Sequence, residues 1–170
     1  TAALEQAEYA LSLSREIGDP STQGYALTHM GHALLSLNRA DEAERCYHEA
    51  LELRDELGES WLAADTRAGL IRLAEARGDS AAGLPHVEAI LHLLETRNLD
   101  GTPDPVGIYL ACYRVLSQRG DARAEAVREQ AYATLQTRAS SISDPALRDS
   151  YLHHVASHRE LLRIQGERAG

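Results

Sequence analysis

Apolar residues recur along the chain at the helical spacing of three and four positions, and no useful stretch alternates with a period of two. Within residues 2–17 they fall on two neighbouring lines of one helix: Leu4, Ala7 and Leu11, and Ala10, Leu13 and Ile17. Gly18 then predicts a helix end, because glycine readily adopts the left-handed conformation of a C-terminal cap. The pattern predicts an all-α fold.

Cap and turn residues divide the rest of the chain into further helices. Asp19-Pro20-Ser21 predicts the start of the second helix, since Asp or Ser caps a helix and Pro fits its first turn. Ser60 is expected to cap a helix from Trp61 to Ala76, and Pro85 to delay or kink the first turn of the helix after it. The prediction is about eight helices: a single helix over 1–18, helix pairs over 19–58, 59–98 and 104–140, and a polar capping helix over 144–165.

The chain also repeats itself. Residues 2–18 match residues 42–58 at an offset of 40, with Ala3 at the place of Ala43 and Ala10 at that of Ala50. The triplet Arg-Gly-Asp at 77–79 returns at 119–121, an offset of 42. We therefore expect a repeat of about forty residues, and a chain that begins in the middle of one.

Small residues stand where two helices of the best-preserved pair must approach closely. Gly31 lies in the first helix, and Ala43, Tyr47 and Ala50 lie in the second. This spacing resembles the tetratricopeptide repeat (TPR). The resemblance implies a right-handed superhelical solenoid of antiparallel helix pairs, as a single domain over residues 1–170.

In that family the first helix of each pair lines a concave groove. The resemblance implies that this chain also has a groove that binds a partner or a ligand. Its expected lining residues are Tyr25, Thr28, His32, Leu35, Ser36, Thr66, Leu70 and Ile108. In the second pair, Asp65 and Arg72 stand at positions that are usually apolar in the family.

Four stretches of the chain resemble the C-terminal repeat segments of large bacterial signalling ATPases, including cyclase-linked and maltose-activator-like regulators. They are GHALLSLNRADEAERCYHEALELRDELG, HVEAIL, RGDARAEAVREQAYATLQTRASSISDPALRDSYL and HRELL. The resemblance implies a non-catalytic interaction scaffold in a larger signalling or transcription regulator. Its expected partner is a protein, a peptide or another domain of the same polypeptide. A homodimer through the incomplete first repeat is a further expectation.

Composition narrows the function classes. The net charge of −9 argues against nucleic acid and anionic membranes as partners, because both need a basic surface. The chain contains no Lys, which excludes phosphate-loop and Schiff-base lysine chemistry. Cys46 and Cys112 are scattered and there is no membrane-length apolar run, so we expect a reduced, cytoplasmic protein. The absence of Lys and Phe, together with abundant Ala, Arg and Gly, indicates a GC-rich bacterial genome.

Two alternatives to the scaffold are open. The groove residues Tyr25, His32 and Leu35 suit a sensor that binds a small molecule or a short peptide. His154 and His158, four apart on one predicted helix, have a spacing that can hold zinc, as a metal-dependent enzyme would require. We expect neither catalysis nor a bound metal or cofactor, because no third ligand is fixed and no base accompanies either cysteine.

Overall fold

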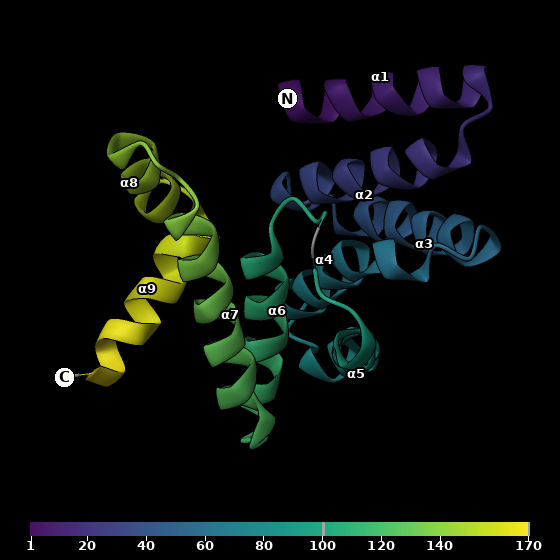
Figure 1. Cartoon of the computed structure of the whole chain (residues 1–170). Coiled ribbons are helices and arrows are strands. Elements are labelled where there is room, and N and C mark those ends of the chain that lie inside the picture. Colours follow the sequence, from purple (N-terminus) through teal and green to yellow (C-terminus); the bar gives the residue numbers. More distant parts are fainter. Residues whose placement is uncertain (100, 170) are drawn as a thin grey trace. The chain divides into compact units, whose positions relative to one another are not determined.

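The computed structural model describes residues 1–99 and 101–169, and within them it contains nine α-helices, one short 3₁₀ helix and no β-strand (Figure 1). The all-α prediction is confirmed, with one helix more than expected. None of the helices in these residues is long and apolar enough to cross a membrane.

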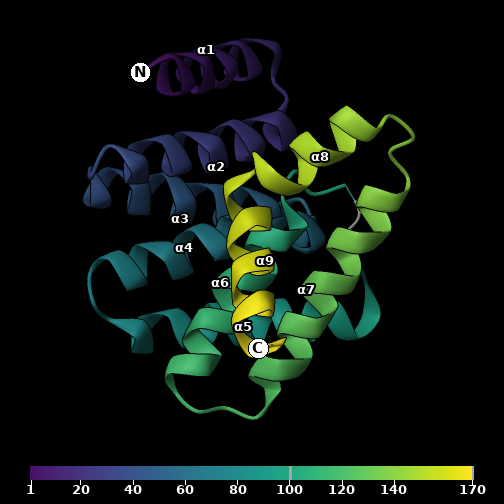
Figure 2. The same ribbon diagram turned by 90° about the vertical axis from the view of Figure 1, so that its left-hand side faces the viewer.

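Contacts between helices group the chain into two compact units, Thr1–Asn98 and Leu99–Gly170. The first contains α1 (Ala2–Ile17), α2 (Pro20–Ser36), α3 (Ala40–Glu56), the 3₁₀ helix η1 (Ser60–Leu62), α4 (Ala63–Ala76) and α5 (Ser80–Thr96). The second contains α6 (Pro105–Gln118), α7 (Arg123–Ser140), α8 (Pro145–His153) and α9 (Ala156–Ala169). In the first unit successive α-helices lie side by side in chain order (Figures 1 and 2). In the second, α9 packs against both α6 and α7.

Aspartate side chains begin four of these helices. Asp19, Asp79, Asp104 and Asp144 each accept a hydrogen bond from a backbone N–H two or three residues further on. Proline follows three of them, at the first helical position, where no backbone donor is needed. The starts predicted at Asp19-Pro20 and Asp144-Pro145 are confirmed.

The end predicted for the first helix is also confirmed. Gly18 has φ 68°, a left-handed conformation that lets the chain leave α1 sharply. The N–H of Asp19 then donates to the carbonyl of Ser14 at 2.9 Å, which satisfies one of the last carbonyls of the helix.

A single aromatic ring sets how closely three helices of the first unit approach. Tyr47 on α3 is fully buried. A Cβ atom added to Gly31 on α2 would lie 2.5 Å from its ring, and one added to Gly69 on α4 would also lie 2.5 Å away. Both positions therefore need glycine, because any side chain would collide with the ring.

The chain enters α4 differently from our prediction. Residues 60–62 form a 3₁₀ turn, in which the N–H of Leu62 donates to the carbonyl of Glu59 at 2.8 Å. The α-helix starts only at Ala63, so the predicted start at Trp61 is wrong. The predicted delay at Pro85 is also wrong: α5 begins at Ser80, capped by Asp79, and passes through Pro85.

The last predicted helix is broken in two. α8 ends at His153 and α9 begins at Ala156. The break frees the carbonyl of Tyr151, and the ring N–H of His158 donates to it at 2.7 Å. It also lets α9 bury Leu161 completely, whereas α8 has no buried residue. The cost of interrupting the helix is thus offset by a replacement hydrogen bond and by apolar burial.

The glycine positions give the first prediction. Gly31→Ala should destabilise the first unit by about 1–3 kcal/mol, because the added methyl overpacks the core against Tyr47. Urea denaturation followed by fluorescence measures this, since the chain's one Trp, Trp61, lies in the first unit.

Gly24→Ala on the same helix is the matched control. A Cβ at Gly24 would meet its nearest atom at 3.6 Å, an ordinary contact, so helix propensity should stabilise this variant by up to about 1 kcal/mol. Equal stabilities for the two variants would contradict the proposed role of the Tyr47 ring.

Candidate functional site

An open groove of about 580 Å³ runs between α1 and α2. Three residues that the sequence predicted for a binding groove, Tyr25, His32 and Ser36, line it. The remaining lining residues come from both helices and are mostly alanines: Ala3, Gln6, Ala7, Ala10, Ala26, His29 and Ala33. The groove therefore has short apolar walls with aromatic rings along one side.

The other five predicted groove residues lie elsewhere. Thr28 and Thr66 are buried, and their hydroxyls share a hydrogen bond of 2.8 Å between α2 and α4. Leu35 packs partly buried against the core that contains Leu70. Ile108 is fully buried on α6 of the second unit. In this structure these side chains support helices and do not line the open groove.

A polar chain runs from the groove into the core of the first unit. Nδ1 of His32 lies 2.8 Å from the hydroxyl of Tyr47, and Nε2 lies 3.3 Å from a carboxylate oxygen of Asp65. Burial raises the pKa of Tyr47 far above its ordinary value, so the phenol stays protonated. We infer that it donates to Nδ1, which leaves the imidazole N–H on Nε2, facing Asp65.

The charge of Asp65 is maintained by that neighbour. Burial acts to raise the pKa of Asp65, but the neighbouring imidazole of His32, together with the charge of Arg72, outweighs it, so the pKa lies below its ordinary value. The sequence gives one signal for this site: Asp65 is a charged residue at a position that is usually apolar in the family that the chain resembles. It does not reveal the partner, because His32 lies on a different helix.

Aromatic rings form a ladder from the surface to the core. The ring centroids of Tyr25 and His29 are 4.3 Å apart, those of His29 and His32 are 5.8 Å apart, and those of His32 and Tyr47 are 5.5 Å apart. Tyr25 is half exposed at the outer end, and Tyr47 is fully buried at the inner end. Three of these rings, those of Tyr25, His29 and His32, line one wall of the groove.

His29 is a groove residue that the sequence prediction does not include. Its Nε2 is buried with no hydrogen-bond partner among the described residues. Burial lowers the pKa of His29, and the neighbouring His32 and Arg54 lower it further, while Asp65 opposes them. His29 therefore favours its neutral form in the folded protein.

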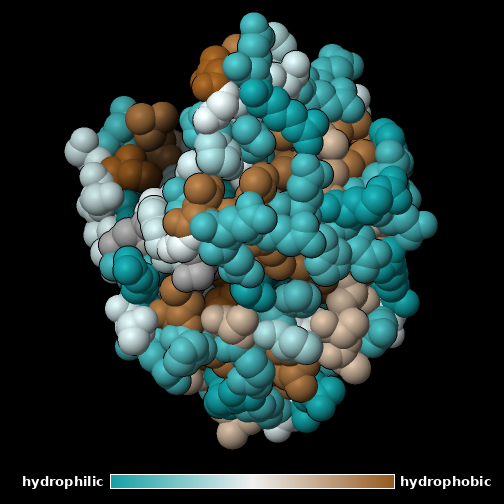
Figure 3. Space-filling model, turned by 90° about the vertical axis from the view of Figure 1, so that its right-hand side faces the viewer, coloured by the Kyte–Doolittle hydropathy of each residue, from teal (hydrophilic) through white to brown (hydrophobic). Residues whose placement is uncertain are grey.

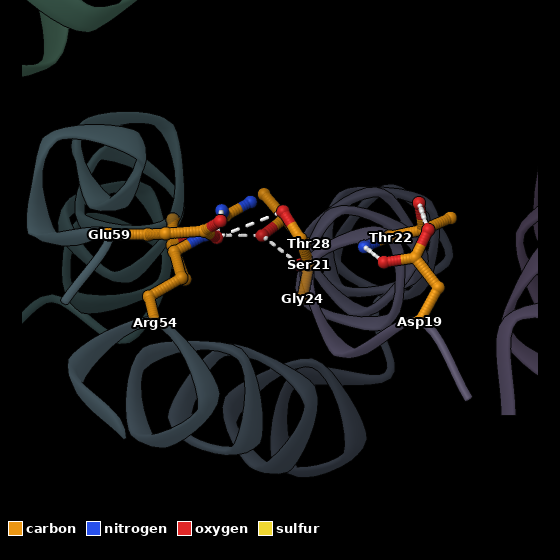
Figure 4. Close-up of polar contacts among 8 residues, drawn as sticks. Asp19, Ser21, Thr22, Gly24, Thr28, Arg54 and Glu59 are labelled. Atoms are coloured by element: carbon orange, nitrogen blue, oxygen red, sulfur yellow. Dashed lines mark hydrogen bonds and ion pairs between the residues drawn. The ribbon is translucent and has the colours of Figure 1, made fainter. Parts of the chain in front are cut away.

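A second polar cluster fixes the start of α2 (Figure 4). Ser21 donates to Glu59 at 2.9 Å, and Nη1 of Arg54 lies 3.8 Å from the same carboxylate. Arg54 is only 3% exposed and its stem packs against Gly24. The cluster holds the start of α2 against the end of α3. It therefore fixes the position of α2, which forms one wall of the groove.

The other side chains with reactive chemistry are the two cysteines and the histidines near the C-terminus. Cys46 and Cys112 are buried thiols, and burial raises the pKa of Cys46, which disfavours the nucleophilic thiolate. His154 lies in the break between α8 and α9, whereas His158 lies in α9, so the shared helix face predicted for them is wrong. In the described residues no three His, Cys, Asp or Glu side chains are grouped so that they could hold a metal.

No protein-family model matches the chain, and no curated protein matches it in sequence. The groove must therefore be interpreted from its own residues.

The partly buried side chain of His29 predicts a pH dependence. Folding lowers the pKa of His29, so the unfolded chain binds its proton first as the pH falls. The first unit should lose stability as the pH decreases below about 6.5, the ordinary value for histidine. Urea denaturation at several pH values between about 7 and 5, where most carboxylates remain ionised, measures the slope.

His29→Gln should flatten this slope but not abolish it, because burial also lowers the pKa of His86 in the same unit. His92→Gln is the control, since His92 is 84% exposed and pairs with Glu95. A native slope in His29→Gln would show that His29 does not titrate differently on folding.

Proposed function

We propose that the chain is a non-catalytic protein-binding module, built as a right-handed solenoid of antiparallel TPR-like helix pairs. We propose that it works as a regulatory scaffold in a larger bacterial signalling or transcription regulator, in the cytoplasm. The expected partner is a protein or peptide, or another domain of the same polypeptide.

The repeat proposal is supported by how the small and large residues of the first unit meet. Gly31 and Gly69 occupy equivalent places on α2 and α4, and both contact the ring of Tyr47. Thr28 and Thr66, at the same offset of 38, also meet each other. A repeated structural unit requires that equivalent residues recur in the sequence and also make equivalent packing contacts.

The observation that carries the binding proposal is the groove between α1 and α2. Apolar side chains remain exposed beside it: Tyr25 is 50% exposed, Leu13 43% and Ile17 65%. Hydrophobic surface is visible over α1 at the top of Figure 3. Exposed apolar surface next to a groove is typical of a protein-interaction site.

Selection from a displayed library of random peptides tests this function without a known partner. The native protein should enrich peptides that share a sequence pattern. Ala10→Glu places a charge in the groove and should abolish the enrichment, whereas Ser12→Glu, an exposed site on α1 outside the groove, should keep it. Enrichment that is absent, or that is equal for both variants, would argue against a binding groove here.

A small-molecule sensor is the second candidate. The groove's volume of about 580 Å³ lies within the ~300–1,000 Å³ of small-molecule sites, and its aromatic ladder offers stacking surface. His32 is unsuitable for a test, because its ring also contacts Tyr47 and Asp65.

Thermal-shift screening of a metabolite library provides that test. A compound at 100 times its Kd should stabilise the protein by about 2.7 kcal/mol. Tyr25→Ala should remove the shift, and Tyr9→Ala, an exposed tyrosine outside the groove, should not. A shift that survives Tyr25→Ala would place the compound elsewhere.

A further inference from the structure

The guanidinium of Arg54 is buried with too few hydrogen-bond acceptors around it. Its Nε and Nη1 atoms are buried and have no hydrogen-bond partner among the described residues. The carboxylate that pairs with it, that of Glu59, lies 3.8 Å from Nη1, which is beyond hydrogen-bond distance. Each buried donor that is left unbonded costs free energy, so the site favours a group that supplies more acceptors.

Other arginines of the chain show how a guanidinium is normally satisfied here. Arg114 on α6 donates from Nε and Nη2 to the two carboxylate oxygens of Glu160. Arg128 on α7 donates from Nε to Glu125 at 3.1 Å. Arg54 is the most deeply buried of the three side chains, yet its ion pair is the longest.

The charge around Arg54 is also incompletely balanced. Burial lowers the pKa of Arg54, and the charges of Glu59 and Asp65 oppose this only in part. The carboxylate of Asp65 is shared, because it lies 3.3 Å from Nε2 of His32. An anion with more charge and more oxygen atoms than one carboxylate would therefore stabilise the buried cation.

The start of α2 adds groups that suit an oxyanion (Figure 4). The hydroxyl of Ser21, in the first turn of α2, donates to Oε2 of Glu59 at 2.9 Å. The backbone of α2 is close as well, since a Cβ atom on Gly24 would lie 3.7 Å from the guanidinium carbon of Arg54. A cation, a hydroxyl donor and the positive end of a helix dipole are the groups with which proteins bind phosphate.

The carboxylate that caps α2 does not compete for this place. Asp19 accepts from the backbone N–H of Thr22 at 3.1 Å and from its hydroxyl at 2.5 Å. In Figure 4 these bonds lie on the side of α2 away from Arg54.

Glu59 fills the place imperfectly and can leave it. Its Oε2 atom serves both neighbours, at 2.9 Å from the hydroxyl of Ser21 but 3.8 Å from Nη1 of Arg54. Its side chain is 25% exposed, and its backbone N–H donates to the carbonyl of Arg54 at 2.8 Å. The side chain can therefore rotate toward solvent while the backbone of the turn stays in place.

We propose that Arg54 and Ser21 form a binding site for a phosphate group, which the carboxylate of Glu59 occupies while no phosphate is bound. The tetrahedral oxygens of phosphate can accept from the hydroxyl and from the guanidinium at the same time, and they carry more charge than a carboxylate. The groove between α1 and α2 is lined by other residues. The phosphate site thus goes beyond the proposed binding function and does not rest on it.

Fluorescence titration with inorganic phosphate tests the proposal, because the chain's one Trp, Trp61, stands two residues after Glu59. Movement of the Glu59 side chain should change the surroundings of Trp61, so the native protein should show a saturable change. Sodium chloride at the same ionic strength should not produce it. O-phosphoserine is the second probe. Tighter binding than that of inorganic phosphate assigns the site to phosphorylated side chains, and equal or weaker binding assigns it to the free ion.

Variants identify the site. Glu59→Gln removes the competing carboxylate, so phosphate should bind at least about tenfold more tightly. Glu56→Gln is the matched control, since it removes the same charge from an exposed position at the end of α3 and should change the affinity less than about twofold. Ser21→Ala should weaken binding about fivefold, as expected for one lost hydrogen bond. Arg54→Met should abolish binding.

Thermal unfolding provides a second readout if a variant folds poorly. In chloride buffer Glu59→Gln should unfold at a lower temperature than Glu56→Gln, because Arg54 loses its carboxylate. Phosphate should remove most of this difference by occupying the site. The general stabilising effect of phosphate salts acts on both variants alike, so it leaves the difference unchanged.

Three results would overturn the proposal. The absence of a saturable change in both the native protein and Glu59→Gln would mean that phosphate does not reach the guanidinium. Equal affinities of Glu59→Gln and Glu56→Gln would mean that phosphate responds only to net charge. Phosphate binding that survives Arg54→Met would place the anion elsewhere.

Discussion

The first unit depends on the burial of one phenol ring between two glycines. Tyr47 extends from α3 into the space between α2 and α4, and it contacts both backbones where Gly31 and Gly69 remove the side chains. The ring supplies apolar volume, and its hydroxyl reaches His32. One side chain therefore sets the helix spacing and also orients a groove residue. The buried ring of Tyr47 is in direct contact with the groove residue His32. The shape of the groove therefore depends on how the core beneath it packs.

The features that could be predicted from the sequence are those decided by neighbours in the chain. An Asp-Pro step favours a helix start through its own carboxylate and ring, as at Asp19 and Asp144, and Gly18 ends a helix through its own backbone freedom. The Gly31 and Tyr47 pair could also be predicted, since a small residue and a large one at repeat spacing indicate close helices. Each of these signals is local or depends on one repeated spacing.

The features that could not be predicted depend on which face each helix turns toward its neighbours. Thr28 and His32 are one helical turn apart, and the repeat pattern predicts both for a groove. Yet Thr28 is buried against Thr66, whereas His32 lines the open space between α1 and α2. The break after His153 likewise depends on a tertiary hydrogen bond, from His158 to the carbonyl of Tyr151. No spacing rule contains either fact, because each is decided by packing partners on other helices.

Arg54 has a consequence for the length of the segment that follows α3. Its guanidinium is almost fully buried, and its ion pair is with Glu59, five residues later, beyond the helix end. A buried cation that loses its carboxylate costs about 3–5 kcal/mol. An insertion or deletion between Arg54 and Glu59 would separate the two charges, and would also move the partner of Ser21. The exposed turn around Gly58 thus has the surface position of a variable loop but should keep a fixed length among related proteins.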